Sequence, residues 1–233
     1  MSEPRYAVYF VPAPETPLYR AGAALIGYDV YRGECLPYPS GLPCDDAEWS
    51  ALTTEPRVYG FHATLKAPFR LAPGRRAEEL AARIAAFAGG WDEGVTITPS
   101  LSAVGGRFAA LVPDAPSPAL DRLAACCVRA FDEFRAPLND DERRKRLTAP
   151  LTARHREYLE RWGYPYVFED FRFHMTLTGP LAVPRRESVL ACLRESLGAV
   201  AGTPAPVDRI ALLRQSDPDS PFRLVANAPL RAS

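Results

Sequence analysis

Histidine is scarce in this sequence, with three among 233 residues, and neither sign of charge predominates, because Lys+Arg and Asp+Glu both number 28. A formal net charge of zero argues against a broad surface for duplex DNA, for which a strongly basic domain is expected, but it leaves room for a local basic pocket. No run approaches the roughly 20 apolar residues of a membrane span. The opening MSEPRYAVYF lacks the basic and apolar regions of a signal peptide. We therefore expect neither a DNA partner nor a membrane partner.

The five cysteines are an odd number and show no CxxC spacing. This favours a reduced, cytoplasmic protein over a disulfide or zinc framework. No cluster of Asp and His has the spacing of metal ligands. We accordingly expect a cytoplasmic monomer that uses neither a metal nor a cofactor.

Alternating and helical hydrophobic patterns follow one another along the chain, which predicts a mixed α+β fold with helices packed on sheets. Residues 32–48 read as a loop, and 140–146 as a solvated helical segment. The expected strands cover 5–11, 57–70, 95–104, 107–113, 171–181, 208–215 and 221–230, and the expected helices cover 17–31, 77–88, 118–134, 152–162 and 187–200.

An internal repeat is the most informative feature of the sequence. Residues 61–65, Phe-His-Ala-Thr-Leu, recur as residues 173–177, Phe-His-Met-Thr-Leu, 112 residues later. Two of the three histidines fall in these copies, and a proline follows three residues after each leucine. We interpret residues 1–233 as one bilobal domain built from two pseudo-repeats. A structural histidine explains one such triplet, but it explains two matching contexts poorly.

Strand alternation gives the repeat a chemical meaning, because successive side chains point to opposite faces of a strand. In the first copy this rule places His62, Thr64 and Lys66 on one face. In the second copy Arg172, His174 and Thr176 share a face. The remaining positions are apolar and suited to packing under helices. Two such strands side by side would form a groove that presents imidazoles, hydroxyls and cations.

Phosphodiester hydrolysis can use this set of groups. One imidazole can accept a proton from the attacking water while the other donates a proton to the leaving oxygen. The hydroxyls of Thr64 and Thr176 can bind the non-bridging oxygens, and Lys66 and Arg172 can offset the charge that develops on phosphorus. We expect His62 and His174 to be the acid–base pair. Which of them is the base depends on which bond breaks.

The two His-x-Thr motifs, His62-Ala63-Thr64 and His174-Met175-Thr176, resemble those of the 2H phosphoesterase superfamily. Runs such as YGFHATLKAPFRL and WGYPYVFEDFRFHMTLTGPL look like the branch of that superfamily encoded with phosphonate-degradation genes. The resemblance implies a bilobal, internally duplicated α+β fold in which antiparallel sheets form a central groove with helices packed outside. It also implies a metal-independent cyclic phosphodiesterase. The expected substrate is a ribose 1,2-cyclic phosphate or a nucleoside 2′,3′-cyclic phosphate.

Two tyrosines are further candidates for substrate binding. Tyr59 precedes the first motif and would reach the groove only if the strand begins later or bulges. Tyr9 lies on the first expected strand, on the opposite face from Tyr6, and one of the two can line the groove. The WGYPY loop can wall the pocket. The basic run 143–146 is a solvated face unless it borders the groove, where it would attract an anion.

Two other functions stay open at this point. The groove would also suit a module that binds a nucleotide or an RNA end without turnover, and an RNA-repair or ligase-like role is the remaining alternative. Intact His and Thr in both copies count against a degenerate binding module. The neutral net charge counts mildly against a large RNA substrate.

Overall fold

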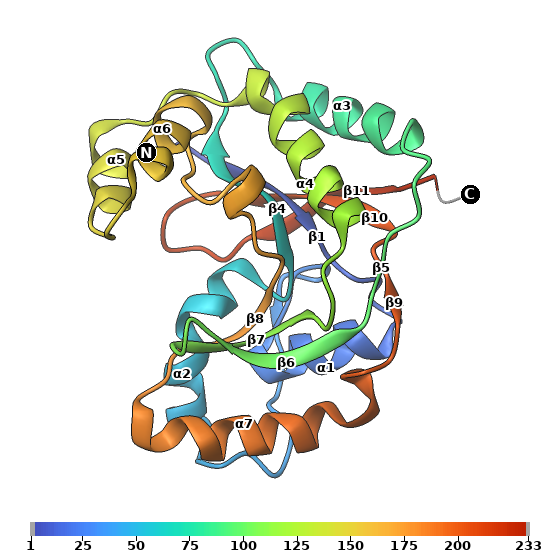
Figure 1. Ribbon diagram of the computed structural model, residues 1–233, viewed down its shortest axis with the longest axis vertical. Helices are drawn as coiled ribbons and strands as arrows, with labels where there is room; N and C mark the ends of the chain where they lie inside the picture. The colour runs from blue at the N-terminus through green and yellow to red at the C-terminus, as the bar shows by residue number, and fades with distance from the viewer. Residues whose placement is uncertain (1–2, 232–233) are drawn as a thin grey trace.

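A seven-stranded antiparallel sheet runs through the computed structural model, which describes residues 3–231 (Figure 1). The order of its strands is β11-β10-β1-β4-β8-β7-β6. Their bounds are β1 Arg5–Phe10, β4 Ala63–Arg70, β6 Pro99–Val104, β7 Phe108–Pro113, β8 Met175–Pro180, β10 Arg209–Gln215 and β11 Arg223–Pro229.

The sheet has two halves that meet where the repeated motifs lie. Strand β4 pairs with β8 through one register position, Ala63 opposite Met175, which are the residues that follow the two histidines. On one side β4 pairs with β1, and on the other β8 pairs with β7. The fold is therefore α+β and bilobal, as the sequence predicted, with both motifs at the junction of the two halves.

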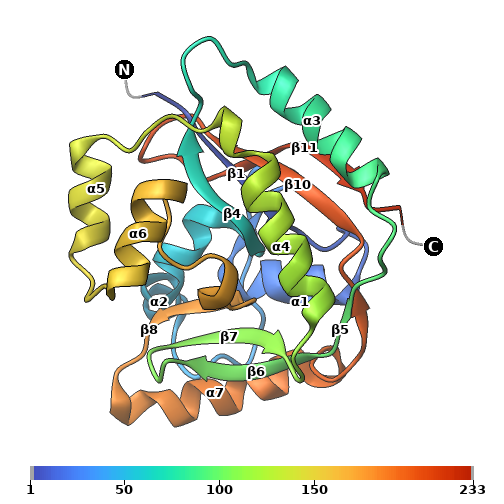
Figure 2. The same ribbon diagram turned by 45° about the horizontal axis from the view of Figure 1, so that its top comes forward.

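Helices cover each half of the sheet, as Figures 1 and 2 show. Helices α3 and α4 pack on the half that holds β4, β10 and β11, whereas α2 and α7 pack on β8 and β6 and α1 lies between them. The helices α5 and α6 stand together beside the junction. The bounds are α1 Pro17–Ile26, α2 Asp46–Tyr59, α3 Ala77–Gly89, α4 Pro118–Ala130, α5 Asp140–Leu147, α6 Ala153–Trp162 and α7 Val183–Leu197.

Short elements complete the fold. Two small antiparallel pairs join β2 to β3 and β5 to β9, and three 3-10 turns connect longer elements. Their bounds are β2 Tyr28–Asp29, β3 Glu34–Cys35, β5 Thr96–Ile97, β9 Ala205–Pro206, η1 Asp132–Phe134, η2 Phe168–Asp170 and η3 Gly198–Val200.

Helix α2 is the main departure from the expected elements, because the sequence assigns 46–48 to a loop, 57–59 to a strand and 49–56 to no element. Asp45 caps it by accepting a hydrogen bond from the Glu48 amide, and buried Trp49 anchors it. Pro56 sits inside its last turn and leaves the carbonyl of Leu52 without a helical donor. That carbonyl lies against Gly179 of β8, where an added Cβ would meet it at 3.1 Å. Pro56 thus belongs to a close helix–strand contact.

Several other boundaries differ from expectation, among them α4, which ends at Ala130 rather than at 134, and α7, which begins at Val183 rather than at 187. Helix α1 ends at Ile26 rather than at 31, because Gly27 adopts a left-handed C-cap with φ of 76°. The second motif strand begins at Met175 rather than at 171, since residues 171–174 make no strand pairs among the described residues. Both histidines therefore lie in the segments that enter β4 and β8.

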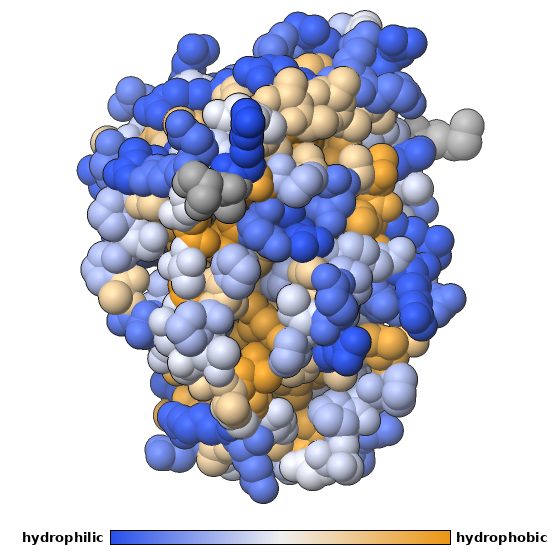
Figure 3. Space-filling model, turned by 90° about the vertical axis from the view of Figure 1, so that its right-hand side faces the viewer, coloured by the Kyte–Doolittle hydropathy of each residue, from blue (hydrophilic) through white to orange (hydrophobic). Residues whose placement is uncertain are grey.

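None of the helices in the range 3–231 is long and apolar enough to cross a membrane. Apolar side chains do reach the surface, and the face shown in Figure 3 has several of them between polar ones.

Candidate active site

A cavity of about 350 Å³ opens at the junction of the two halves. Six of the eight site residues predicted from the sequence line it: Tyr9, Tyr59, His62, Thr64, His174 and Thr176. They come from β1, the end of α2, β4, β8 and the segments that precede these two strands. The structure thus brings the two His-x-Thr motifs to one pocket.

Both imidazoles are held by the same local contact. The Nδ1 atom of His62 lies 2.8 Å from the carbonyl oxygen of Gly60, and Nδ1 of His174 lies 2.7 Å from that of Arg172. A carbonyl oxygen can only accept, so each Nδ1 carries the hydrogen. In the neutral ring this leaves the lone pair on Nε2, which is the nitrogen available for proton transfer.

Glycine at position 60 is required by the backbone there. Gly60 ends α2 with φ of 73°, and an added Cβ would lie 1.9 Å from the Val30 side chain. The same turn aims the Gly60 carbonyl at His62. The end of the helix and the orientation of the first imidazole therefore depend on one residue.

Aromatic rings partly bury the first histidine. Tyr9 stacks on His62 with ring centroids 3.8 Å apart and planes inclined by 21°, and Tyr59 lies at 6.2 Å. This burial lowers the pKa of His62 to about 4, with the charge of His174 acting in the same direction. His62 is therefore neutral at pH 7 and suited to accept a proton.

The two motif threonines face the cavity beside the histidines. Thr64 Oγ1 lies 3.3 Å from His62 Nε2, and Thr176 lines the pocket from β8. Thr178, the next residue on that face of β8, is instead buried and accepts a hydrogen bond from the Ala109 amide. The Thr178 hydroxyl is thus engaged with the backbone, since it also donates to the Gly179 carbonyl, whereas no backbone partner is found for the hydroxyls of Thr64 and Thr176 among residues 3–231.

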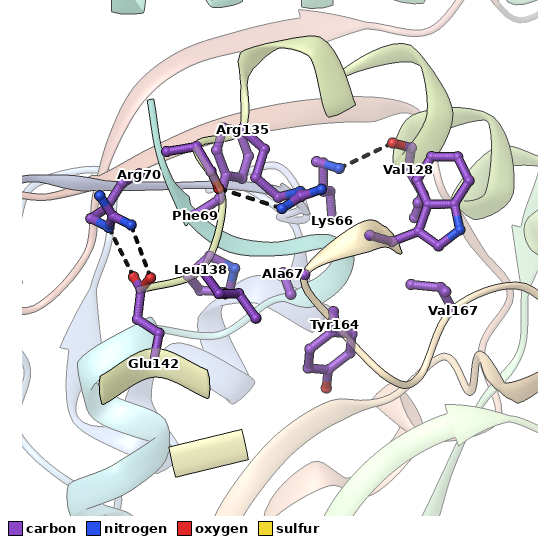
Figure 4. Close-up of a pocket in the computed structure, with 14 residues that line it drawn as sticks. Lys66, Ala67, Phe69, Arg70, Val128, Arg135, Leu138, Glu142, Tyr164 and Val167 are labelled. Atoms are coloured by element: carbon purple, nitrogen blue, oxygen red, sulfur yellow. Dashed lines mark hydrogen bonds and ion pairs between the residues drawn. The ribbon is translucent and has the colours of Figure 1, made fainter. Parts of the chain in front are cut away.

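Lys66 does not share the face of Thr64, contrary to the sequence prediction. Tyr9 pairs with Thr64 and Val8 pairs with Lys66, so β4 has one residue more than β1 over this step. This β-bulge reverses the alternation of side chains. The buried Lys66 ammonium points away from the cavity and donates to the carbonyl of Val128 of α4, as Figure 4 shows. It also donates to Asp132, and both contacts measure 3.0 Å.

Arg172 also lies away from the cavity. Its segment is not a strand, and the exposed guanidinium donates to the backbone carbonyls of Glu169 and Phe171. The alternation of side chains along β8 therefore does not extend back to Arg172, and its side chain does not share the face of Thr176. What Arg172 contributes to the site is its own carbonyl, which holds His174.

Tyr59 reaches the cavity because the strand begins later, at Ala63, with α2 ending at Tyr59. Tyr164 of the WGYPY loop also lines the cavity, and Phe108 lies 5.8 Å from the ring of His174. These aromatic side chains surround the imidazoles with apolar surface.

Two arginines of the cavity were not identified as site residues from the sequence. Arg107 lies in the turn between β6 and β7, and Arg146 lies near the end of α5. Arg146 belongs to the basic run 143–146, for which the sequence analysis left open a place at the border of the groove. Nothing in the sequence pattern pointed to Arg107. Glu55 adds a carboxylate at an exposed position, and the other lining residues are Pro56, Ala67, Pro68, Thr178, Gly179 and Pro180.

Within the described part of the chain, no three His, Cys, Asp or Glu side chains are grouped so that they could hold a metal ion. The groups that the cavity offers for chemistry are therefore its imidazoles, hydroxyls and guanidiniums.

Comparison with known proteins places the chain in a family. The family model described as "Protein of unknown function (DUF1045)" matches residues 64–223, and the chain belongs to this family. A protein of Janthinobacterium sp. (strain Marseille), named ribose 1,5-bisphosphate phosphokinase PhnN, is 38% identical over 94% of this chain and 49% of its own length. A protein of the same name from Laribacter hongkongensis is 35% identical over 94% of this chain and 50% of its own length. The chain thus spans about half the length of these relatives.

Among solved structures, LigT of E. coli, complexed with 3′-AMP, covers 98% of this chain and 99% of its own with 14% identity and a TM-score of 0.42. This similarity is distant.

Proposed function

We propose that this member of the DUF1045 family is a metal-independent phosphoesterase that opens a cyclic phosphodiester of a ribose or nucleotide. The observation that carries the proposal is the matched anchoring of His62 and His174. Two imidazoles in one cavity, each held at Nδ1 by the carbonyl two residues earlier, keep both Nε2 atoms free of backbone partners. General acid–base catalysis needs such a pair of oriented groups.

In the proposed reaction His62 is the base. It is neutral at pH 7 because burial depresses its pKa, and its Nε2 takes a proton from the attacking water. The water oxygen forms a bond to phosphorus while the bond from phosphorus to one ring oxygen breaks. His174 takes part as the imidazolium, protonated on both nitrogens: Nδ1 keeps its hydrogen on the Arg172 carbonyl, and Nε2 gives its proton to that leaving oxygen, which becomes a sugar hydroxyl. The product is a phosphomonoester, and proton exchange with solvent restores both histidines.

Thr64 and Thr176 are assigned to the non-bridging oxygens of the phosphate. Their hydroxyls lie on the same side of β4 and β8 as the histidines, where they can donate to the oxygens as negative charge grows in the transition state. The aromatic surroundings exclude water from these bonds, which strengthens them.

A ribose 1,2-cyclic phosphate that carries a 5-phosphate is the substrate we favour. The relatives are named for ribose 1,5-bisphosphate, a ribose with phosphates at C1 and C5. Breaking the bond from phosphorus to O2 of the cyclic compound would yield that molecule. A nucleoside 2′,3′-cyclic phosphate is the second candidate, because Tyr9, Tyr59 and Tyr164 offer aromatic surface on which a base can stack.

Phosphorus NMR of ring opening tests the proposal. EDTA-treated protein would be incubated with ribose 1,2-cyclic phosphates and nucleoside 2′,3′-cyclic phosphates in ¹⁸O-labelled water. We expect one class to open, with the label in the new phosphomonoester and the position of that ester showing which bond broke. If no cyclic phosphate is opened but calorimetry shows tight nucleotide binding, the site is a binding module and the proposal is wrong.

A further inference from the structure

The cavity has two arginines without acidic partners. Within residues 3–231, neither Arg107 nor Arg146 has a carboxylate within ion-pair distance. Neighbours of Arg146 on α5 behave differently: Arg143 pairs with Glu160 at 2.7 Å and Arg144 with Asp141 at 2.9 Å. A guanidinium left unpaired in a pocket is available to an anionic ligand.

Arg146 is held in place by contacts that involve no apolar core. None of the residues of α5 is buried. Glu142 in its first turn accepts two hydrogen bonds of 3.1 Å from Arg70 of β4, which Figure 4 shows, and also caps the helix through the Asn139 amide. At the other end, the Arg146 guanidinium lies over the Tyr164 ring at 4.8 Å. Stacking on an aromatic face leaves the N–H edge of an arginine free to donate.

Arg107 belongs to the other half of the molecule. It follows Gly105 and Gly106, which turn with φ of 57° and 65°, and it precedes Phe108 beside His174. Its carbonyl accepts a hydrogen bond from the Leu181 amide at 2.6 Å, which fixes the backbone, while its side chain is exposed. The two arginines therefore approach the cavity from separate elements, one on the His174 side and one beside Tyr164.

The charge of the cavity exceeds what one cyclic phosphate requires. A cyclic diester has one negative charge, whereas the lining offers Arg107, Arg146 and the His174 imidazolium of the proposed reaction against one carboxylate, that of exposed Glu55. A terminal phosphate adds a charge of about −1.5 to −2 at pH 7 and accepts paired hydrogen bonds from a guanidinium. A volume of about 350 Å³ suits a small sugar phosphate rather than an oligonucleotide.

We propose that the site selects a cyclic phosphodiester that has a second, terminal phosphate, with Arg146 binding the terminal group and Arg107 facing the phosphate between the histidines. This inference rests on the proposed phosphoesterase function and specifies its substrate class. Arg146 is then the residue that determines specificity, and Arg107 contributes to binding the reacting group.

The test compares kcat/KM for ribose 1,2-cyclic phosphate with and without a 5-phosphate. For the wild type we expect a preference of about 100-fold for the phosphorylated compound, the scale of a charge-assisted bidentate contact. Arg146→Gln should reduce this preference by about tenfold or more, and Arg107→Gln should lower kcat/KM for both compounds by similar factors. Lys145→Gln removes the same charge from the preceding, exposed residue of α5 and should keep the preference.

A wild-type preference near one would overturn the inference, as would an Arg146→Gln variant that keeps the full preference. Competition separates binding from turnover: ribose 5-phosphate should inhibit the wild type more strongly than ribose, and Arg146→Gln should lose that difference. Failure of the proposed function gives another result, because then neither compound is opened by the wild type. Thermal melting of each variant checks that its fold is intact.

Discussion

Tyr9 and His62 stack with their ring centroids 3.8 Å apart, although 53 residues separate them in the chain. The stack covers one face of the imidazole and contributes to the burial that depresses its pKa. Tyr9, a residue of β1, thereby helps to keep the His62 imidazole neutral.

Removing the Tyr9 ring should raise the pKa of His62. We expect Tyr9→Leu to move that pKa upward from about 4 and to lower kcat at neutral pH, because water reaches the imidazole and its orientation loosens. Tyr9→Phe keeps the ring and is the matched control, with activity within about threefold of the wild type. Histidine NMR titration measures the pKa, and a Tyr9→Leu value still near 4 would contradict the role given to the stack.

The motif threonines should be needed for turnover rather than for folding. Thr64→Val and Thr176→Val keep the branched shape but remove the hydroxyl, and each should lower kcat by about 100-fold, the usual effect of losing one donor to a developing oxyanion. Thr64→Ser and Thr176→Ser retain the hydroxyl and should recover most of the rate. If the valine variants keep wild-type kcat, the hydroxyls do not bind the reacting phosphate.

Activity should persist to unusually low pH on its acid side. His62 must be neutral to accept a proton, and with a pKa of about 4 it stays neutral down to that pH. We expect the acid limb of the profile of kcat/KM to fall near pH 4 rather than near 6.5. A limb at the ordinary histidine value would mean that His62 is not the base or is not buried in solution.

The same shift should affect stability. Between pH 6.5 and about 4, the unfolded chain binds a proton at this position and the native chain does not, so the free energy of unfolding decreases as the pH falls. One proton corresponds to a slope of about 1.4 kcal/mol per pH unit. In His62→Gln this contribution should be absent, which urea unfolding at several pH values can measure.

Lys66 should matter for stability and not for phosphate binding. Its buried ammonium pairs with Asp132, and removing it leaves that carboxylate with Arg135 alone. We expect Lys66→Met to destabilise the fold by about 1 to 3 kcal/mol. The KM for a cyclic phosphate should stay within about threefold of the wild type. A large rise in KM without loss of stability would restore the role that strand alternation assigned to Lys66.

The repeat allowed much of the site to be predicted from the sequence. Matching contexts around His62 and His174 indicated paired strands, and the structure places Ala63 opposite Met175. The apolar face was also predictable, since Phe61 and Leu65 are buried as alternation requires. These features depend on side chains that alternate between the two faces of a strand over a few residues, and this pattern can be read from the sequence.

The cations could not be predicted in the same way. A bulge opposite Val8 and Tyr9 turns the buried Lys66 side chain away from the cavity. Arg172 precedes β8, so the alternation of that strand does not fix the direction of its side chain. Both errors come from extending alternation past the point where regular pairing holds. The arginines that do line the cavity, Arg107 and Arg146, come from a turn and a solvated helix. Only the tertiary fold brings those segments to the site.

The central claim is that two histidines open a cyclic phosphate without a metal. The most direct measurement is the rate of ring opening by EDTA-treated wild type, His62→Gln and His174→Gln on the preferred compound of the phosphorus NMR panel. We predict full activity of the chelated wild type and a loss of about 1,000-fold or more in each variant, with melting temperatures retained. Loss of activity on chelation, or near-normal rates in either variant, would contradict the account.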